Sequence, residues 1–271
     1  MLAHESDRFL NAPPPASNRG TKGDTKGEEN AWNADCLEIA ALMMPSHPNA
    51  ARWRDKGIDY RMTATATPDD VKSSLVVDGK KASERISGYC VTEDYAVGNH
   101  GIYPHPDYTV ASYAGGLRML VFYSLVGVQP PCGNIFNADK IYRMFVDHAW
   151  PSPPYSEPGG TIYRRDGTIY WAAKGESDRA GRYYLWLNQD LLIDALRLDR
   201  GCSVPAMKWA DLHSKRILDA MDEKTGKIKL PCYSPQSYLH AALNGYLIRR
   251  LVLNGQFLDP RSKGTETTQP K

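Results

Sequence analysis

The stretch "VGNHGIYPHPDYTVASYAGGLRMLVFYSLV" occupies residues 97–126, and its two parts differ sharply in character. The first part places Asn99, His100 and His105 among glycines and prolines. The second part, 106–126, is nearly all apolar and begins with a proline, which fits the first turn of a helix. The sequence therefore predicts a buried helix whose N-terminus is preceded by a polar loop.

Other parts of the chain repeat this contrast between apolar and amphipathic helical segments. An apolar segment belongs in an inner layer, and an amphipathic segment belongs outside it with one face in solvent. We expect three buried helices, at 27–44, 106–126 and 235–253. Two half-exposed outer helices are expected at 48–65 and 137–149, and two further helices at 179–198 and 205–222.

Strand signals are confined to one short region. The segment "GTIYRRDGTIYW" alternates isoleucines with polar residues around Asp166-Gly167, which predicts a small β-hairpin near 161–171. The predicted fold is mainly α, an incomplete (α/α) toroid built from helical hairpins; an irregular helical bundle is the alternative. About three and a half hairpins are too few for ring closure, so we expect an apolar edge near 235–253 that favours self-association.

The ends of the chain differ in composition from its centre. Residues 1–26 are rich in Pro, Gly, Asn and Lys, which predicts an extended N-terminal arm. The polar residues 259–271 predict a disordered tail. The toroid-like domain is therefore expected over 27–258.

Composition excludes some classes of partner and favours others. Lys and Arg number 33 against 31 Asp and Glu, a net charge of +2 that does not indicate nucleic-acid binding. No uncharged run reaches the ~20 residues of a membrane span, so no membrane partner is expected. Sixteen Tyr and six Trp against five Phe suit a sugar-binding cleft, although they also suit amphipathic packing.

The polar loop before the helix at 106–126 is the first candidate site. Asn99 offers an amide donor and His100 a titratable one, and together they can neutralise a carboxylate near the positive end of a helix. Tyr103, His105 and Tyr108 lie beside them and are candidate substrate-binding residues. The alternative is that this Asn-His pair only caps loop amides.

A metal site in the same loop is a weaker hypothesis. His100, His105 and Asp107 are ligand types, but no fourth ligand stands near them in the sequence. The five cysteines are also scattered without metal-ligand spacing. We therefore expect no metal.

The start of the helix at 27–44 carries a second group of candidates. Trp32 can stack on a sugar ring, and the amides of Asn30 and Asn33 share a helix face. Helix capping and core packing are the alternative roles for these residues.

The predicted hairpin and the segment after it carry a third group. Tyr163 and Tyr170 alternate with arginines, and Arg179 and Arg182 follow before the next helix. A cleft tyrosine beside arginines can act as an acid or a base, whereas a surface hairpin carries the same residue types without function.

Three motifs in this order resemble the toroid domain of the heparinase II/III-like and alginate-lyase-like polysaccharide lyases: "EENAWNAD" at 28–35, "GNHGIYPHPDY" at 98–108 and "GTIYRRDGTIYW" at 160–171. The resemblance implies an α/α toroid that acts on an acidic oligo- or polysaccharide by β-elimination, without a cofactor. It implies that Asn99 and His100 neutralise the uronate carboxylate while a tyrosine, for which Tyr163 is the candidate, moves the protons. It also suggests a periplasmic or secreted location.

Two other functions remain open at this point. A glycoside hydrolase on an α/α barrel needs two carboxylates about 5–10 Å apart. Glu28, Glu29, Asp94 and Asp107 are available, but no pair among them is singled out. The third hypothesis is a non-catalytic glycan-binding or interaction module, which the small number of hairpins favours.

Overall fold

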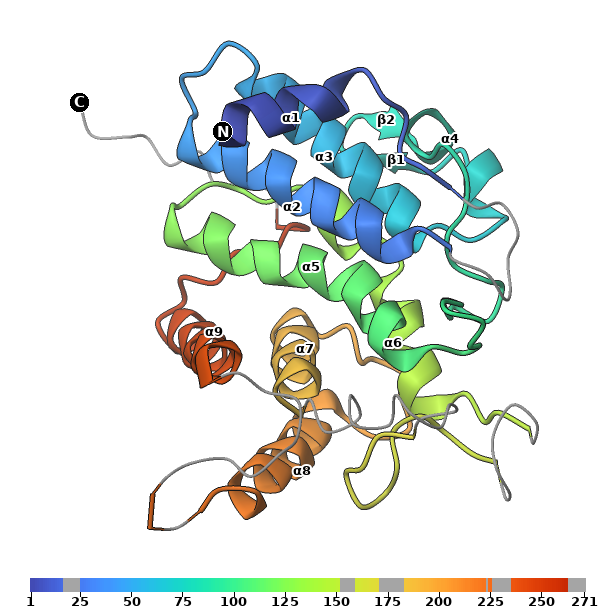
Figure 1. Cartoon of the computed structure of the whole chain (residues 1–271), viewed down its shortest axis with the longest axis vertical. Helices are drawn as coiled ribbons and strands as arrows, with labels where there is room; N and C mark the ends of the chain where they lie inside the picture. The colour runs from blue at the N-terminus through green and yellow to red at the C-terminus, as the bar shows by residue number, and fades with distance from the viewer. Residues whose placement is uncertain (17–24, 152–158, 171–182, 223, 226–234, 263–271) are drawn as a thin grey trace.

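The structure, a computed structural model, describes residues 1–16, 25–151, 159–170, 183–222, 224–225 and 235–262, and of 235–241 only the backbone. Within these residues the protein is mainly helical, as expected, with one two-stranded sheet (Figure 1). The α-helices are α1 (Leu2–Leu10), α2 (Gly27–Met43), α3 (Ala50–Thr65), α4 (Ala82–Arg85), α5 (Pro106–Leu125), α6 (Ala138–Asp147), α7 (Tyr183–Leu196), α8 (Ala206–Asp219) and α9 (Pro235–Leu253). The strands are β1 (Val76–Val77) and β2 (Lys80–Lys81), and short 3-10 turns lie at Asp70–Lys72 and Cys132–Ile135.

Helix α5 separates an upper and a lower group of helices. α3 packs on α2 and α2 packs on α5, while α7 contacts both α8 and α9. Figure 1 shows α1, α2 and α3 above α5, with α7, α8 and α9 below it. The largest apolar cluster joins α5, α6 and α7, around Tyr113, Phe145 and Trp186.

A buried ionic cluster holds α2, α3 and α5 together. The Arg61 side chain on α3 is 1% exposed, and its Nη2 lies 2.7 Å from Asp35 Oδ1 and 2.9 Å from Glu38 Oε1 on α2. Asn134 Nδ2 donates to the other oxygen of Glu38 at 2.8 Å, and Arg118 on α5 pairs with Asp35. Because two guanidinium groups face two carboxylates, the cluster is neutral, which a buried group of charges requires.

Two adjacent glycines in α5 make room for this cluster. A Cβ at Gly115 would lie 2.7 Å from Arg61 Nη1, and one at Gly116 would fall well inside van der Waals contact with the Asn134 carbonyl oxygen. A glycine within a helix costs roughly 1 kcal/mol relative to alanine. Here that cost is offset by the close approach of α5 to Arg61 and to the turn that contains Asn134.

Several expectations about exposure and order are corrected by the structure. The segment 1–26 is not wholly an extended arm, because α1 folds and packs on α2 and α3. Its Phe9 ring meets Tyr60 edge-on at 5.7 Å, and Asp7 Oδ1 accepts from Trp53 Nε1 at 2.8 Å. The apolar residues of this short segment stand only at its two ends, at 2–3 and 9–10, so the sequence did not predict the helix.

Helix α3, expected outside α2 and half-exposed, is buried as extensively as its partner. Every residue from 60 to 65 is buried, because α1 and the β1–α4 segment form a further layer over α3. Arg85 in α4 ties that layer down, since its Nη1 lies 2.9 Å from Asp59 and its Nε donates to the Val77 carbonyl at 2.9 Å. Helix α6 matches the amphipathic expectation, with Asp139, Lys140 and Arg143 exposed.

Helix α9, expected to be buried around most of its circumference, is covered on one side only. Its buried residues among those described are Ile248 and Leu251, whereas Leu243, Tyr246 and Leu253 are exposed. Because apolar residues lie all around α9, the sequence predicted burial of both faces, but only one face meets α5 and α7.

The hairpin near 161–171 and the tail after residue 259 also differ in detail from expectation. Tyr163 and Ile169 form one isolated bridge around the Asp166-Gly167 turn instead of regular strands. Residues 259–262 are docked rather than disordered, since Gln129 Nε2 donates to the Asp259 carbonyl at 2.8 Å. Residues 171 and 263–271 lie outside the described part of the chain.

The glycine pair leads to a prediction about the sign of a change in the free energy of unfolding. Replacing Gly116 by Ala should lower the free energy of unfolding by roughly 1–3 kcal/mol, because the new methyl group pushes α5 away from Asn134. Helix propensity alone would raise it by about 1 kcal/mol. Urea unfolding of the G116A variant measures the sign, and a stabilised variant would show that the two backbones are not in contact.

Candidate functional site

The loop before α5 is a tight turn that presents His100 at its tip. Asn99 and Ile102 exchange two backbone hydrogen bonds, of 3.1 and 2.8 Å, with His100 and Gly101 at positive φ between them. Two successive positive φ angles define the type of turn that closes β-hairpins. His105 N donates to the Val97 carbonyl at 2.9 Å and closes the base of the loop.

Asn99 and His100 point in opposite directions from this turn. Asn99 is buried, its Oδ1 accepts from His100 N at 2.7 Å, and its Nδ2 donates to Glu28 Oε1. Glu28 is itself buried in the first turn of α2. The Asn99 amide therefore anchors the loop to α2 and does not face the cleft as expected, whereas His100 is exposed.

His100 pairs with a tyrosine on the first turn of α5. His100 Nε2 lies 2.7 Å from the Tyr108 hydroxyl oxygen, and the two rings meet edge-on at 5.2 Å. His105 is fully buried and caps α5, since its Nδ1 accepts from Tyr108 N at 3.4 Å. The His105 ring also packs edge-on against Tyr108 at 4.5 Å, so that the Tyr108 ring is held from two sides.

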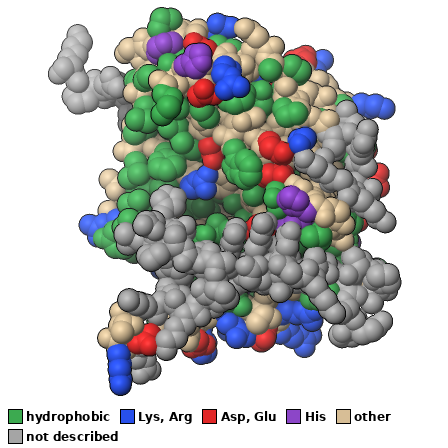
Figure 2. Space-filling view, viewed as in Figure 1, with side chains coloured by type: hydrophobic (Ala, Val, Ile, Leu, Met, Phe, Trp, Pro, Cys, Tyr) green, Lys and Arg blue, Asp and Glu red, His purple; other side chains and the backbone are tan. Residues whose placement is uncertain are grey.

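A pocket of about 300 Å³ opens beside Tyr108, between α2, α5 and α7. Figure 2, drawn in the same view as Figure 1, shows a hollow in this face of the molecule with charged and histidine side chains beside it. Trp32 borders the pocket and is 56% exposed, which is unusual for so large an apolar ring. The lining residues are Trp32, Asp35, Asp107, Tyr108, Val110, Ala111, Ala114, Gly115, Arg118 and Leu185.

The electrostatics of the pocket are set by the buried ionic cluster beneath it. Asp35 is shared between Arg61, which is buried, and Arg118, whose side chain is 38% exposed. Since Asp35 is held by two cations, Arg118 can bind an additional anion with its remaining N–H groups. Sequence reasoning missed both Asp35 and Arg118. The available signals were the aspartate that ends the motif at 28–35 and the arginine within an otherwise apolar helix.

Some of the predicted residues lie away from the pocket. Tyr103 donates to Asp94 Oδ2 at 3.1 Å and packs edge-on against Trp150, and burial raises the pKa of its hydroxyl. Asn30 is buried and donates to the Pro15 carbonyl at 2.6 Å. Asn33 is half-buried on α2.

The candidates in and after the hairpin are not brought to Tyr108 either. The Tyr170 ring is covered by the guanidinium of Arg164 at 4.6 Å. Arg179 and Arg182 lie outside the described residues.

Tyr163 belongs to a separate, fully buried polar network. Its hydroxyl donates to Asp190 Oδ1 at 2.9 Å and accepts from Gln189 Nε2, both on α7. Asp190 also accepts from Tyr142 at 2.9 Å and lies 2.6 Å from His213 Nδ1 on α8. Burial raises the pKa of both Tyr163 and Asp190. Sequence reasoning missed this network, although Gln189-Asp190 within the apolar run of α7 signals buried polar residues.

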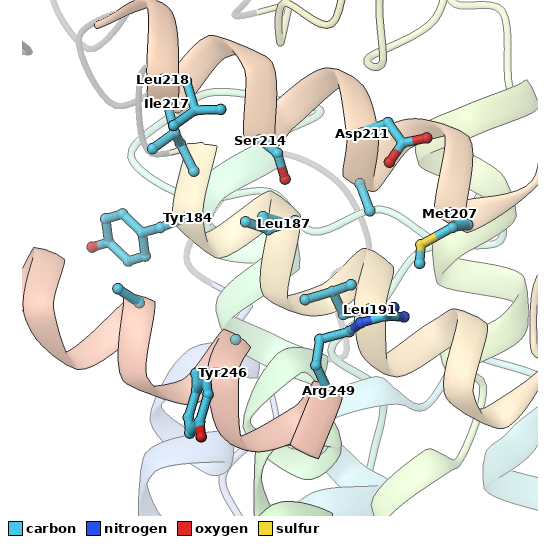
Figure 3. A pocket seen from close by; sticks show the side chains of 13 residues that line it. Tyr184, Leu187, Leu191, Met207, Asp211, Ser214, Ile217, Leu218, Tyr246 and Arg249 are labelled. Atoms are coloured by element: carbon cyan, nitrogen blue, oxygen red, sulfur yellow. The ribbon is translucent and has the colours of Figure 1, made fainter. Parts of the chain in front are cut away.

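A second, more apolar groove of about 520 Å³ runs between α8 and α9 with α7 as its floor (Figure 3). Leu187 and Leu191 form the floor, and Met207 and Ile217 lie on the α8 wall. Among its described lining residues only Asp211 and Arg249 are charged, so it is less suited than the pocket beside Tyr108 to a polar substrate.

Comparison of the chain with protein-family models, with curated proteins and with solved structures found no match. Within the described residues, no helix is long and apolar enough to cross a membrane. The same residues hold no group of three or more His, Cys, Asp or Glu side chains placed to bind a metal ion. The assignment of a function therefore depends on the geometry of the site.

The contact between Asn99 and Glu28 leads to a stability prediction. Asn99→Asp places a second carboxylate against Glu28, so the free energy of unfolding should fall by about 3 kcal/mol or more, against about 1–3 kcal/mol for Asn99→Ala. Adding Glu28→Gln to Asn99→Asp supplies a donor again and should recover most of the loss. Urea unfolding at neutral pH tests this order, and an Asn99→Asp variant as stable as the wild type would contradict the contact.

The position of Tyr163 leads to a second stability prediction. Tyr163→Phe removes the hydrogen bond to the buried Asp190 carboxyl and the one accepted from Gln189, and should cost about 1–3 kcal/mol. Tyr95→Phe is the matched control, because Tyr95 is only partly buried, and it should change stability by less than about 0.5 kcal/mol. Thermal unfolding measures the difference, and equal melting temperatures for Tyr163→Phe and Tyr95→Phe would contradict the prediction.

Proposed function

We propose that this protein is a polysaccharide lyase-like enzyme that cleaves a uronate-containing glycan by β-elimination, with the cleft beside Tyr108 as its active site and an incomplete α/α toroid as its fold. The observation that carries the proposal is the 2.7 Å contact between His100 Nε2 and the Tyr108 hydroxyl at the edge of a pocket that also holds Trp32 and Arg118. The resemblance of three sequence motifs to such lyases supports it.

Two of the lining residues, Trp32 and Arg118, bind the substrate in the proposal. The exposed face of Trp32 stacks on a sugar ring, as aromatic faces do with flat apolar surfaces. Arg118 binds the uronate carboxylate with the N–H groups that do not hold Asp35. Neutralising that carboxylate stabilises the enolate-like anion that forms when the C5 proton leaves. Asn99 does not touch the substrate in this proposal; it positions the loop through its hydrogen bond to Glu28.

The His100–Tyr108 pair moves the protons. The Tyr108 oxygen takes the C5 proton while its own proton passes to His100 Nε2. The C4–O4 bond then breaks and leaves a C4–C5 double bond, O4 takes the proton from Tyr108, and His100 returns its proton to Tyr108. The pair ends in its starting state, so the reaction consumes no oxidant, reductant or water.

The proposal predicts a large effect from removing a single oxygen atom. Tyr108→Phe should lower turnover of a responsive uronate polymer by about 10²–10⁴-fold, because the ring remains but the acid–base group is lost. The measurement is the ultraviolet absorbance of the unsaturated product, over a panel of mannuronate, guluronate, galacturonate and glucuronate polymers. Tyr95→Phe is the matched control and should retain wild-type turnover.

Other outcomes separate the alternative functions. New reducing ends without ultraviolet absorbance would indicate hydrolysis, and would overturn the elimination mechanism. Glycan binding by the wild type without any turnover would favour a binding module. Full turnover by Tyr108→Phe would remove Tyr108 from the mechanism.

A further inference from the structure

Helix α9 carries an exposed stripe of large side chains opposite its buried face. Leu243, Tyr246 and Leu253 are 51%, 63% and 73% exposed, and Arg250 lies on the same stripe and is exposed. The four positions are separated by three, four and three residues, which is the spacing of a seam along which two helices pack. Tyr246 and Arg249 both line the groove between α8 and α9; in Figure 3 the Tyr246 side chain lies at its edge.

The stripe is complementary to itself in one orientation. If a second copy of α9 packs antiparallel about a two-fold axis, Leu243 of one copy falls opposite Leu253 of the other. In the same register Tyr246 falls opposite Arg250, where a guanidinium can lie over a tyrosine ring. A parallel pairing would instead place Arg250 against Arg250, and the like charges would repel each other.

We propose that the face of α9 formed by Leu243, Tyr246, Arg250 and Leu253 is a homodimer interface in which the two helices run antiparallel. A two-fold axis makes the same patch serve both copies, and each Tyr246–Arg250 contact then occurs twice. The apolar rim of the neighbouring groove, which includes Leu218 at 64% exposed, extends the surface that a second copy covers. One helix pair is small for an interface, so the dimer should be weak, with a Kd in the micromolar range.

Exchanging the tyrosine and the arginine tests the Tyr246–Arg250 contact with two variants rather than one. Sedimentation velocity of the full chain over a concentration series should show a monomer–dimer equilibrium. Tyr246→Arg places two arginines together at each contact and should raise Kd by at least about tenfold. Adding Arg250→Tyr recreates both tyrosine–arginine pairs with their positions exchanged and should restore the wild-type Kd. Leu75→Lys, at a residue 56% exposed far from α9 in the sequence and in the fold, is the matched control and should leave Kd unchanged.

Cysteine cross-linking tests the orientation. A chain that carries both Leu243→Cys and Leu253→Cys should form a disulfide-linked dimer under mild oxidation, because each introduced thiol faces its counterpart in the antiparallel register. Leu243→Cys alone should not, since the two introduced thiols would lie roughly 15 Å apart along the helices. Far-ultraviolet circular dichroism of every variant confirms that it remains folded.

Three results would overturn the proposal. These are a wild type that stays monomeric at all concentrations, a dimer whose Kd is unchanged by Tyr246→Arg, and cross-linking of Leu243→Cys alone as fast as that of the double variant. The first would leave the stripe to a different partner, and the last would indicate a parallel pair.

Discussion

The Arg61 guanidinium is the group on which the packing of the upper helices depends. It is buried on α3, holds two carboxylates of α2 and lies against the glycine pair of α5. A buried cation of this kind contributes little net stability, but removing one partner leaves an uncompensated charge in the interior. The arrangement therefore specifies one way of packing three helices: other alignments of α2 and α3 would separate the guanidinium from Asp35 and Glu38.

This constraint reaches the candidate site through Asp35. One oxygen of its carboxyl contacts Arg61 and the other contacts Arg118 at the pocket. The position of Arg118 is thus fixed by the same cluster that aligns the helices, and its guanidinium does not depend on a loop for its place at the pocket. Tyr108 is held similarly, since His105 caps the helix that carries it. Under the proposed function, a site preorganised in this way stabilises developing charge without rearranging during the elimination.

The sequence predicted the boundaries of a helix well where residues at its N-terminus carry a clear signal. The buried helix expected at 106–126 is α5, and its boundaries agree because Pro106 begins it and the His105 side chain caps it. The layers were predicted less well. The pattern of α3 shows charged residues such as Arg61 and Asp59, but it cannot show which other segments bring counterions to them. The same limit applies to the candidate site: His100 and Tyr108 are close in sequence and were both named as candidates, for a uronate carboxylate and for substrate binding, whereas the place of Arg118 depends on how α2 and α5 pack.

The docked segment 255–262 bears on how the chain folds as it is synthesised. It joins regions made far apart in time, because Leu258 N donates to Ser124 Oγ, and Arg261 donates to the Leu196 carbonyl as well as pairing with Asp259. The Arg61 cluster is complete once residue 134 has emerged, whereas these late contacts need more than a hundred further residues, about 5–25 s at usual rates of translation. All partners of Arg61 are therefore present on the nascent chain before α7 and α9, which cover the lower side of α5, have been made. During that interval the apolar residues of α5 that pack against α7 and α9 in the complete fold have no partner helix.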